Sequence, residues 1–208
     1  MNKRPIFTSI LCAAALQFSP AVSAADDKSP WLVRVRAVDV VPDESSSTSI
    51  GGSVTVGDRI VPELDISYFW TDHFATELIL ATNSHNIGAN GTALGDLDLG
   101  NVSLLPPTFL AQYHFNPDGQ LRPYIGAGIN YTFFYDADAG DVNSISYEDG
   151  FGYALQAGID IGLNDNWALN ADIKKLFLNT DASINDGAVT ADVDLDPWIF
   201  GFGLAYRF

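Results

Sequence analysis

The segment WIFGFGLAYRF (residues 198–208) alternates between two kinds of side chain. Large apolar residues occupy every second position, from Trp198 through Phe202 to Phe208. The positions between them are mostly small, as at Gly201 and Gly203. Successive side chains of a β-strand point to opposite faces of a sheet, so a period of two residues predicts a strand with two unlike faces.

The same alternation recurs along the chain and is clearest in residues 122–135 and 150–163. Eight segments can be placed, at 31–41, 62–70, 74–83, 105–115, 122–135, 150–163, 167–178 and 194–208. They are joined in turn by tight turns (71–73, 116–121, 164–166) and by long loops rich in Gly, Ser, Asn and Asp (42–61, 84–104, 136–149, 179–193). We therefore predict an all-β fold, an eight-stranded antiparallel up-and-down barrel with both termini at the short-turn end.

The large apolar side chains indicate which face of each strand points outward. An eight-stranded barrel has an interior that side chains only just fill, and six or seven large residues per strand would overfill it. We therefore expect the small and polar residues inside and the large ones outside, against lipid. The segment lengths suit tilted membrane-spanning strands of roughly 9–11 residues. The alternative is a soluble sandwich or a lipocalin-like barrel with the apolar face inward.

The first 24 residues read as a targeting segment. Lys3 and Arg4 precede a short apolar run (6–16), and Val22-Ser23-Ala24 supplies small residues for cleavage before Ala25. This pattern predicts a secretory signal peptide over 1–24 and an outer-membrane β-barrel domain over 25–208. The run is too short for a helix that anchors the chain in a bilayer.

The charge of the chain is low in amount and strongly negative. Its 208 residues hold 26 acidic and 10 basic side chains, for a net charge of −16. Cleavage would remove two bases and no acid, giving −18, and would also remove Cys12, the single cysteine. An acidic chain without a basic stripe is a poor partner for nucleic acid.

Aromatic residues gather at the predicted strand ends. Most of them lie at the short-turn end, and Trp198 lies near the opposite boundary. Rings of aromatic side chains belong at the headgroup level of a membrane, so these positions predict an aromatic girdle. Its members are Trp31, Trp70, Phe74, Phe115, Trp167, Trp198 and Phe208.

Several motifs resemble those of the OmpW family of outer-membrane proteins. They are Leu-Pro-Pro (105–107), RPYIGAGINY (122–131), Asp-Pro-Trp (196–198) and a terminal Phe after alternating hydrophobics. The resemblance implies location in the outer membrane of a Gram-negative bacterium, with periplasmic termini. It also implies passive uptake of small hydrophobic molecules through an apolar extracellular channel with lateral exit into the membrane. The implied partners are outer-membrane lipids, lipopolysaccharide, small hydrophobic solutes and the barrel-assembly machinery, which would recognise Phe208.

Two features suggest where such a path could run. Pro106 and Pro107 lack the N–H of a strand ladder, so they either open the barrel wall or merely end a loop. Loop 84–104 is apolar for an extracellular loop, so it either lines an entry for oily solutes or forms a strand extension with its own core. The candidate transport path is Leu94, Leu97, Leu99, Leu104, Leu105, Pro106 and Pro107.

Polar residues of inward parity form a second candidate set. Charges facing lipid are costly, so these side chains belong inside the barrel. They could provide an ion pathway, but a plug of salt bridges in a narrow lumen is the favoured interpretation. The set is Arg34, Arg36, Glu63, Asp65, Glu77, Gln112, Asp160, Asp172, Lys174 and Arg207, with Asn130 and Gln156 of the same parity. Lys175 has outward parity and either snorkels to the outer boundary or marks a strand irregularity.

The remaining residues suggest no chemistry. Acidic residues crowd the loops around 136–149 and 181–196, but they lack the spacing of a calcium-binding loop. His73, His85 and His114 have no nucleophile motif or metal-ligand spacing nearby. We predict no catalytic residue, no cofactor and no metal. The alternative function is a surface interaction protein whose acidic loops bind an external partner without transport.

Overall fold

Fourteen strands make up the secondary structure of the computed structural model, which describes residues 29–41, 45–48, 53–56, 59–93, 95–138, 140, 142–185 and 189–208. The predicted signal peptide lies outside these residues. The strands are β1 (Trp31–Val41), β2 (Ser45–Thr48), β3 (Ser53–Val56), β4 (Arg59–Phe69), β5 (Phe74–Ala81), β6 (Asn83–Thr92), β7 (Gly95–Leu105), β8 (Thr108–His114), β9 (Leu121–Asp138), β10 (Ile145–Tyr147), β11 (Gly150–Gly162), β12 (Trp167–Ile184), β13 (Val189–Asp194) and β14 (Trp198–Arg207). Among the described residues, no helix is long and apolar enough to cross a membrane.

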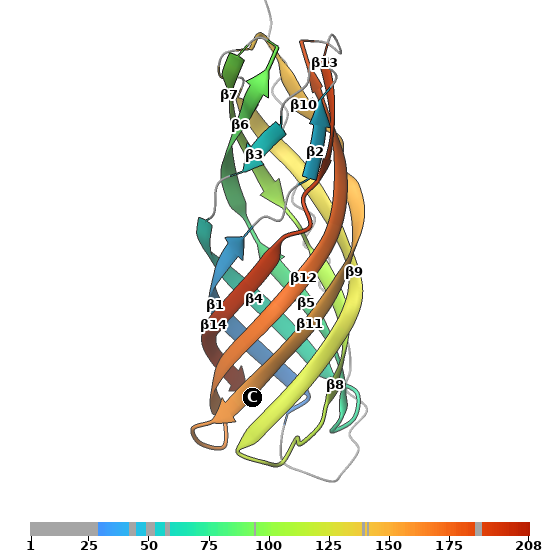
Figure 1. The fold of residues 1–208 in the computed structure, drawn as a ribbon. Helices are drawn as coiled ribbons and strands as arrows, with labels where there is room; N and C mark the ends of the chain where they lie inside the picture. The colour runs from blue at the N-terminus through green and yellow to red at the C-terminus, as the bar shows by residue number, and fades with distance from the viewer. Residues whose placement is uncertain are drawn as a thin grey trace, which may run out of the picture.

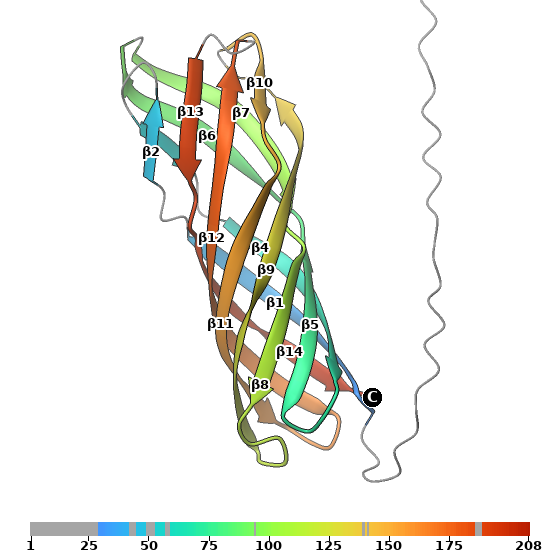
Figure 2. The same ribbon diagram turned by 90° about the vertical axis from the view of Figure 1, so that its right-hand side faces the viewer.

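Eight of these strands close into a barrel (Figure 1). The antiparallel order is β1, β4, β5, β8, β9, β11, β12 and β14, and β14 returns to pair with β1. The backbone N–H of Ser29 donates to the carbonyl of Phe208 at 2.8 Å, so the first and last described residues meet. Figure 2 shows the C-terminus at the end that carries the tight turns. The predicted eight-stranded antiparallel barrel is confirmed.

The two faces of each strand differ as the alternation predicted. In β11, Phe151 and Tyr153 are 76% and 71% exposed, whereas Gly152 between them and Ala154 and Gln156 beyond them are buried. The same division of large outward and small or polar inward side chains holds in β14. The exposed apolar surface is suited to lipid, which takes the place of a packed core.

Strands occupy much of the four segments that were predicted as long loops. β9 and β12 each run for 18 residues, which corresponds to about 60 Å at roughly 3.3 Å per residue. Even a tilted strand of this length extends beyond the hydrocarbon core of a membrane, which is roughly 30 Å thick. Their upper parts join short strands in two further sheets, β3-β6-β7-β9 and β2-β13-β12-β10 (Figure 1). These extensions form because residues such as Ile87, Ala89, Leu97 and Leu99 keep the period of two, so one face of each extension is apolar.

An apolar cavity above a polar plug

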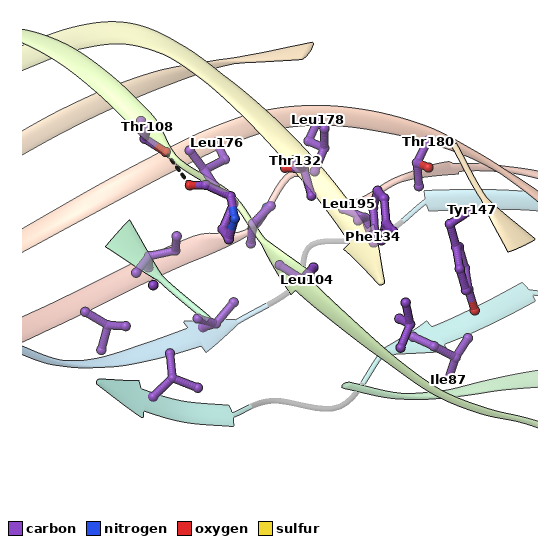
Figure 3. Close-up of a pocket in the computed structure, with 18 of the residues that line it drawn as sticks. Ile87, Leu104, Thr108, Thr132, Phe134, Tyr147, Leu176, Leu178, Thr180 and Leu195 are labelled. Atoms are coloured by element: carbon purple, nitrogen blue, oxygen red, sulfur yellow. Dashed lines mark hydrogen bonds between the residues drawn. The ribbon is translucent and has the colours of Figure 1, made fainter. Parts of the chain in front are cut away.

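A cavity of about 100 Å³ lies between the two extension sheets and the upper end of the barrel. One water molecule needs roughly 10–15 Å³ measured in the same way, so the space suits a small organic molecule. Its lining is almost entirely aliphatic and aromatic, and Figure 3 shows side chains from several strands around one space. The lining residues are Val38, Val40, Val61, Glu63, Ile79, Ala81, Ile87, Leu99, Val102, Leu104, Pro106, Thr108, Thr132, Phe134, Ile145, Tyr147, Lys174, Leu176, Leu178, Thr180, Ala182, Ile184, Leu195, Pro197 and Ile199.

Two buried apolar clusters form the upper and lower parts of this lining. The upper cluster joins Leu99 and Val102 of one extension sheet to Ala182 and Ile184 of the other. The lower cluster lies inside the barrel mouth and contains Val38, Val40, Val61, Ile79, Leu110, Ala154, Leu176 and Ile199. The apolar surface is therefore continuous from the extensions down into the barrel.

Charged residues close the barrel beneath the cavity. Arg36 is buried, and its guanidinium lies 3.0 Å from Glu63, 2.6 Å from Asp65 and 2.5 Å from Asp172. Lys174 donates to Glu63 at 2.5 Å, and these two side chains also line the cavity. The floor of the cavity is thus an ion network in which each cation has at least one buried acidic partner.

A second arm of the network lies deeper in the barrel. Arg34 donates to Glu77 at 2.8 Å and to both carboxylate oxygens of Asp160. Gln112 and Gln156 each donate to Glu77, at 2.8 and 3.0 Å. We call the two arms together the plug, consisting of Arg34, Arg36, Glu63, Asp65, Glu77, Gln112, Gln156, Asp160, Asp172 and Lys174.

Three uncharged side chains complete the plug, although sequence reasoning did not single them out as members of it. Ser67 accepts from Arg34 at 3.0 Å, and Asn170 donates to Asp160 at 2.7 Å. The hydroxyl of Tyr124 accepts from Asn170 at 3.0 Å, and its ring lies under the Arg34 guanidinium. Their inward parity was the only available signal, and it does not separate a network member from a space-filling residue.

Glycine makes room for this network. A Cβ atom on Gly158 would lie 2.4 Å from the ring and hydroxyl of Tyr124 and 2.8 Å from the Cβ of Asp172. We expect Gly158→Ala to displace Tyr124 and to lower the free energy of unfolding by about 1–3 kcal/mol, because the filled lumen leaves little space for adjustment. Urea unfolding in lipid vesicles would measure the change.

The matched control for Gly158→Ala lies on the same strand. At Gly162 the nearest atom to an added Cβ is the flexible end of Arg122, so Gly162→Ala should cost about 0.5 kcal/mol or less. Equal losses in the two variants would contradict a packed Tyr124.

The barrel wall is interrupted beside the cavity. β5 pairs with β8 up to Ile79↔Thr108, and β6 pairs with β7 from Asn83↔Leu104. Residues 80–82 and 105–107, all described, form no ladder between these two pairings. Segment 105–107 stays aligned with β9 on its other side, where the N–H of Tyr131 donates to the carbonyl of Pro107 at 3.1 Å. The prolines thus leave one edge of the wall unpaired.

The candidate path residues take different places around this interruption. Leu99, Leu104 and Pro106 line the cavity, and Leu97 packs against the upper cluster. Leu105 lies on the outer face and is 36% exposed. Pro107 is half-buried and is not part of the lining, and Leu94 lies outside the described residues.

The seven candidate girdle residues are all exposed on the barrel. Six of them flank three tyrosines that sequence reasoning missed. Tyr68 lies edge-on to Trp31 and Trp70, Tyr113 to Phe74 and Phe115, and Tyr206 to Trp167 and Phe208, with ring centroids 4.8–5.1 Å apart. Each tyrosine has the outward parity of its strand, so the alternation could have found it.

Two basic residues lie apart from the plug. Arg207 is below it, over the ring of Phe69 and bonded to the carbonyl of Ser29 at 2.9 Å. Lys175 follows the regular alternation of β12, so no strand irregularity occurs there. It lies outward, donates to the carbonyl of Asp196 at 2.5 Å and sits over the ring of Trp198.

Comparison with known proteins places this barrel among its relatives. The chain is 40% identical to the uncharacterized outer-membrane protein y4mB of Sinorhizobium fredii, over 94% of this chain and 90% of that protein. It is 28% identical to the dibenzothiophene metabolism operon protein PahQ of Pseudomonas aeruginosa, over 88% and 90% of the two chains. The crystal structure of the outer membrane protein OprG from Pseudomonas aeruginosa matches with a TM-score of 0.81 and 30% identity, over 87% of this chain and 97% of that one.

The family model of the OmpW family matches residues 28–208. That range includes every strand of the barrel and of both extension sheets. The chain therefore belongs to the OmpW family, and it is an eight-stranded β-barrel of the bacterial outer membrane.

Proposed function

We propose that this protein is a passive route by which small hydrophobic molecules enter the outer membrane. A solute enters the apolar cavity between the extension sheets from the outside. It then leaves sideways through the unpaired stretch of wall between residues 80–82 and 105–107. No covalent step takes part, and partition of apolar surface out of water drives the transfer.

One observation carries this proposal most directly: the apolar cavity reaches the interruption in the wall. Ile79 and Ala81 line the cavity from one side of the unpaired stretch, and Leu104 and Pro106 line it from the other. Below the cavity, Lys174 and Glu63 begin the ion network. An apolar molecule that moved down the barrel axis would have to separate these paired charges. The lateral direction therefore costs less than the axial one.

The name of one relative agrees with this chemistry. PahQ is described as a dibenzothiophene metabolism operon protein, and dibenzothiophene is a small apolar molecule. Membership of the OmpW family supports the same substrate class, through the resemblance stated above.

A cross-link across the interruption tests the lateral exit. Continuing the register of the flanking ladders places Ala81 opposite Pro106. We expect Ala81→Cys/Pro106→Cys, bridged by a short reducible bis-thiol reagent, to lower the initial uptake of an alkane by cells about tenfold or more. Reductant should restore it. The only other cysteine of the sequence is Cys12.

The control pair lies just above the interruption. Ser84 and Ser103 already face each other in the β6–β7 ladder, so bridging Ser84→Cys/Ser103→Cys should leave uptake unchanged. If the bridged Ala81/Pro106 variant takes up alkane at the unbridged rate, the lateral exit is wrong. If cells with and without the protein take up alkane equally, the transport proposal itself fails and a surface interaction becomes the better reading.

A further inference from the structure

A side-chain hydrogen bond crosses the interruption in the barrel wall. The hydroxyl of Tyr135, on β9, lies 2.6 Å from the hydroxyl of Thr82, and both residues are exposed. Thr82 is the last residue of the unpaired stretch 80–82, which forms one edge of the interruption. β9 belongs to the other edge, because segment 105–107 stays aligned with it. The bond therefore joins two edges between which the described backbone forms no ladder.

The register of the strands shows which way the Tyr135 side chain runs. Tyr135 lies opposite Ser103 of β7, and Ser103 lies opposite Ser84 of β6. Leu104 lines the cavity, so its neighbour Ser103 faces outward, as the 44% exposed Tyr135 does. Thr82 precedes Ser84 by two residues. The phenol of Tyr135 thus crosses the outer face of β7 and reaches Thr82 where the ladder between β6 and β7 ends.

The backbone of β9 changes course directly after Tyr135. Asp136 has a φ of 49°, in the left-handed region that non-glycine residues seldom adopt. The pairing advances by two residues on β7, from Asn101 to Ser103, but by three on β9, between Tyr135 and Asp138. A β-bulge of this kind bends a strand and re-aims a side chain beside it. The direction of the Tyr135 side chain therefore has a cause in the backbone that is independent of its hydrogen bond.

We propose that the hydrogen bond between Tyr135 and Thr82 is a latch that holds the lateral exit closed until a solute passes. This inference rests on the proposed function and names what controls the same exit. Ala81, the neighbour of Thr82, lines the cavity, so a solute that leaves beside Ala81 passes under the latch. Breaking this one bond frees the edge, whereas an intact pairing such as β8 with β9 would have to lose several backbone bonds together.

Either partner of the latch can lose its hydroxyl while most of its shape is kept. In cells that carry Tyr135→Phe, we expect the initial uptake of n-octane to rise about two- to tenfold, the range that one hydrogen bond accounts for. Thr82→Val should give the same rise. The double variant should give no further rise, because both changes break the same bond. Rises that multiply in the double variant would show that the two side chains act separately, and would overturn the latch.

Another tyrosine on the outer face supplies the matched control. Tyr153 is exposed, but it lies on β11 and is paired on both sides, with β9 and with β12. Tyr153→Phe should therefore leave uptake unchanged. An equal rise in this control would mean that loss of any outer hydroxyl loosens the barrel. Unchanged uptake in both Tyr135→Phe and Thr82→Val would mean that the bond does not limit passage. Either result overturns the latch.

A cross-linking measurement without solute distinguishes this inference from the transport proposal. In purified protein in lipid vesicles, a short rigid bis-thiol reagent bridges Ala81→Cys/Pro106→Cys when the edges are closed, and a longer rigid reagent bridges the pair only when they separate. Adding Tyr135→Phe should raise the fraction bridged by the longer reagent about two- to tenfold, and adding Tyr153→Phe should not. That rise in a protein that gives no uptake would support the latch and overturn transport. Uptake by cells, with neither uptake nor bridging changed by Tyr135→Phe, would support transport and overturn the latch.

Discussion

Arg36→Met should lower the free energy of unfolding by about 3–5 kcal/mol, the largest loss expected from a single change in this barrel. Arg36 is the cation closest to Asp65 and one of two that contact Asp172. Methionine fills most of the same space but leaves these buried carboxylates short of a partner, and an uncompensated buried charge costs about this much. Urea unfolding in lipid vesicles, followed by tryptophan fluorescence, would give the value.

Two further variants make that result specific to the ion network. Lys175→Met also removes a cation, but one near the outer boundary, and should cost about 1 kcal/mol or less. Adding Asp65→Asn to Arg36→Met should recover part of the loss, because it removes one of the stranded charges. A loss below about 1 kcal/mol for Arg36→Met would show that water or protons neutralise the carboxylates instead.

Val102→Asp should reduce alkane uptake by cells about tenfold or more. Val102 is buried in the upper cluster and lines the cavity that we propose as the entry. A carboxylate of similar size would hold water in that space, and an apolar solute would have to displace it. The initial rate of uptake, compared at equal amounts of protein in the outer membrane, measures the effect.

The neighbouring residue supplies the control for that charge. Asn101 is exposed on the opposite face of β7, so Asn101→Asp adds the same charge outside the cavity and should leave uptake unchanged. Folding of both variants can be checked by comparing the gel mobility of the unheated protein with that of the heated protein. If Val102→Asp folds and still supports full uptake, solutes do not pass through this cavity.

The barrel itself could be predicted because one pattern repeats in every spanning strand. The faces of β11 and β14 follow directly from the alternation of large and small residues. The extension sheets could not be predicted in the same way. β6 contains Gly88, Gly91 and three asparagines, a composition typical of loops, and its pairing with β7 includes register shifts. Such a strand is held by its neighbours, which the local sequence does not reveal.

For the site, too, the sequence predicted which face of a strand a residue lies on, but not which residue it contacts. Parity placed Arg36 and Asp172 inside, but it could not say that they meet, because that depends on the stagger between strands 136 residues apart in the chain. Tyr147 was missed for another reason. It lies in a segment interpreted as an acidic loop, and the only signal of a strand was the spacing of Ile145 and Tyr147 by two residues.

The pairing of the first strand with the last has a consequence for the order of assembly. Arg34 and Arg36 lie on β1, yet they depend on Asp160 and Asp172, which follow more than a hundred residues later. Contacts so distant along the chain form slowly, and until β14 joins β1 the inner face is an open sheet with unpaired charges. An open sheet of this kind is costly in lipid. Closure therefore completes the neutralisation of the lumen. A chain cut short before β14 would keep the contacts of its arginines with Glu63, Asp65 and Glu77 on the neighbouring strands, but it would leave Asp160 and Asp172 without Arg34 and Arg36.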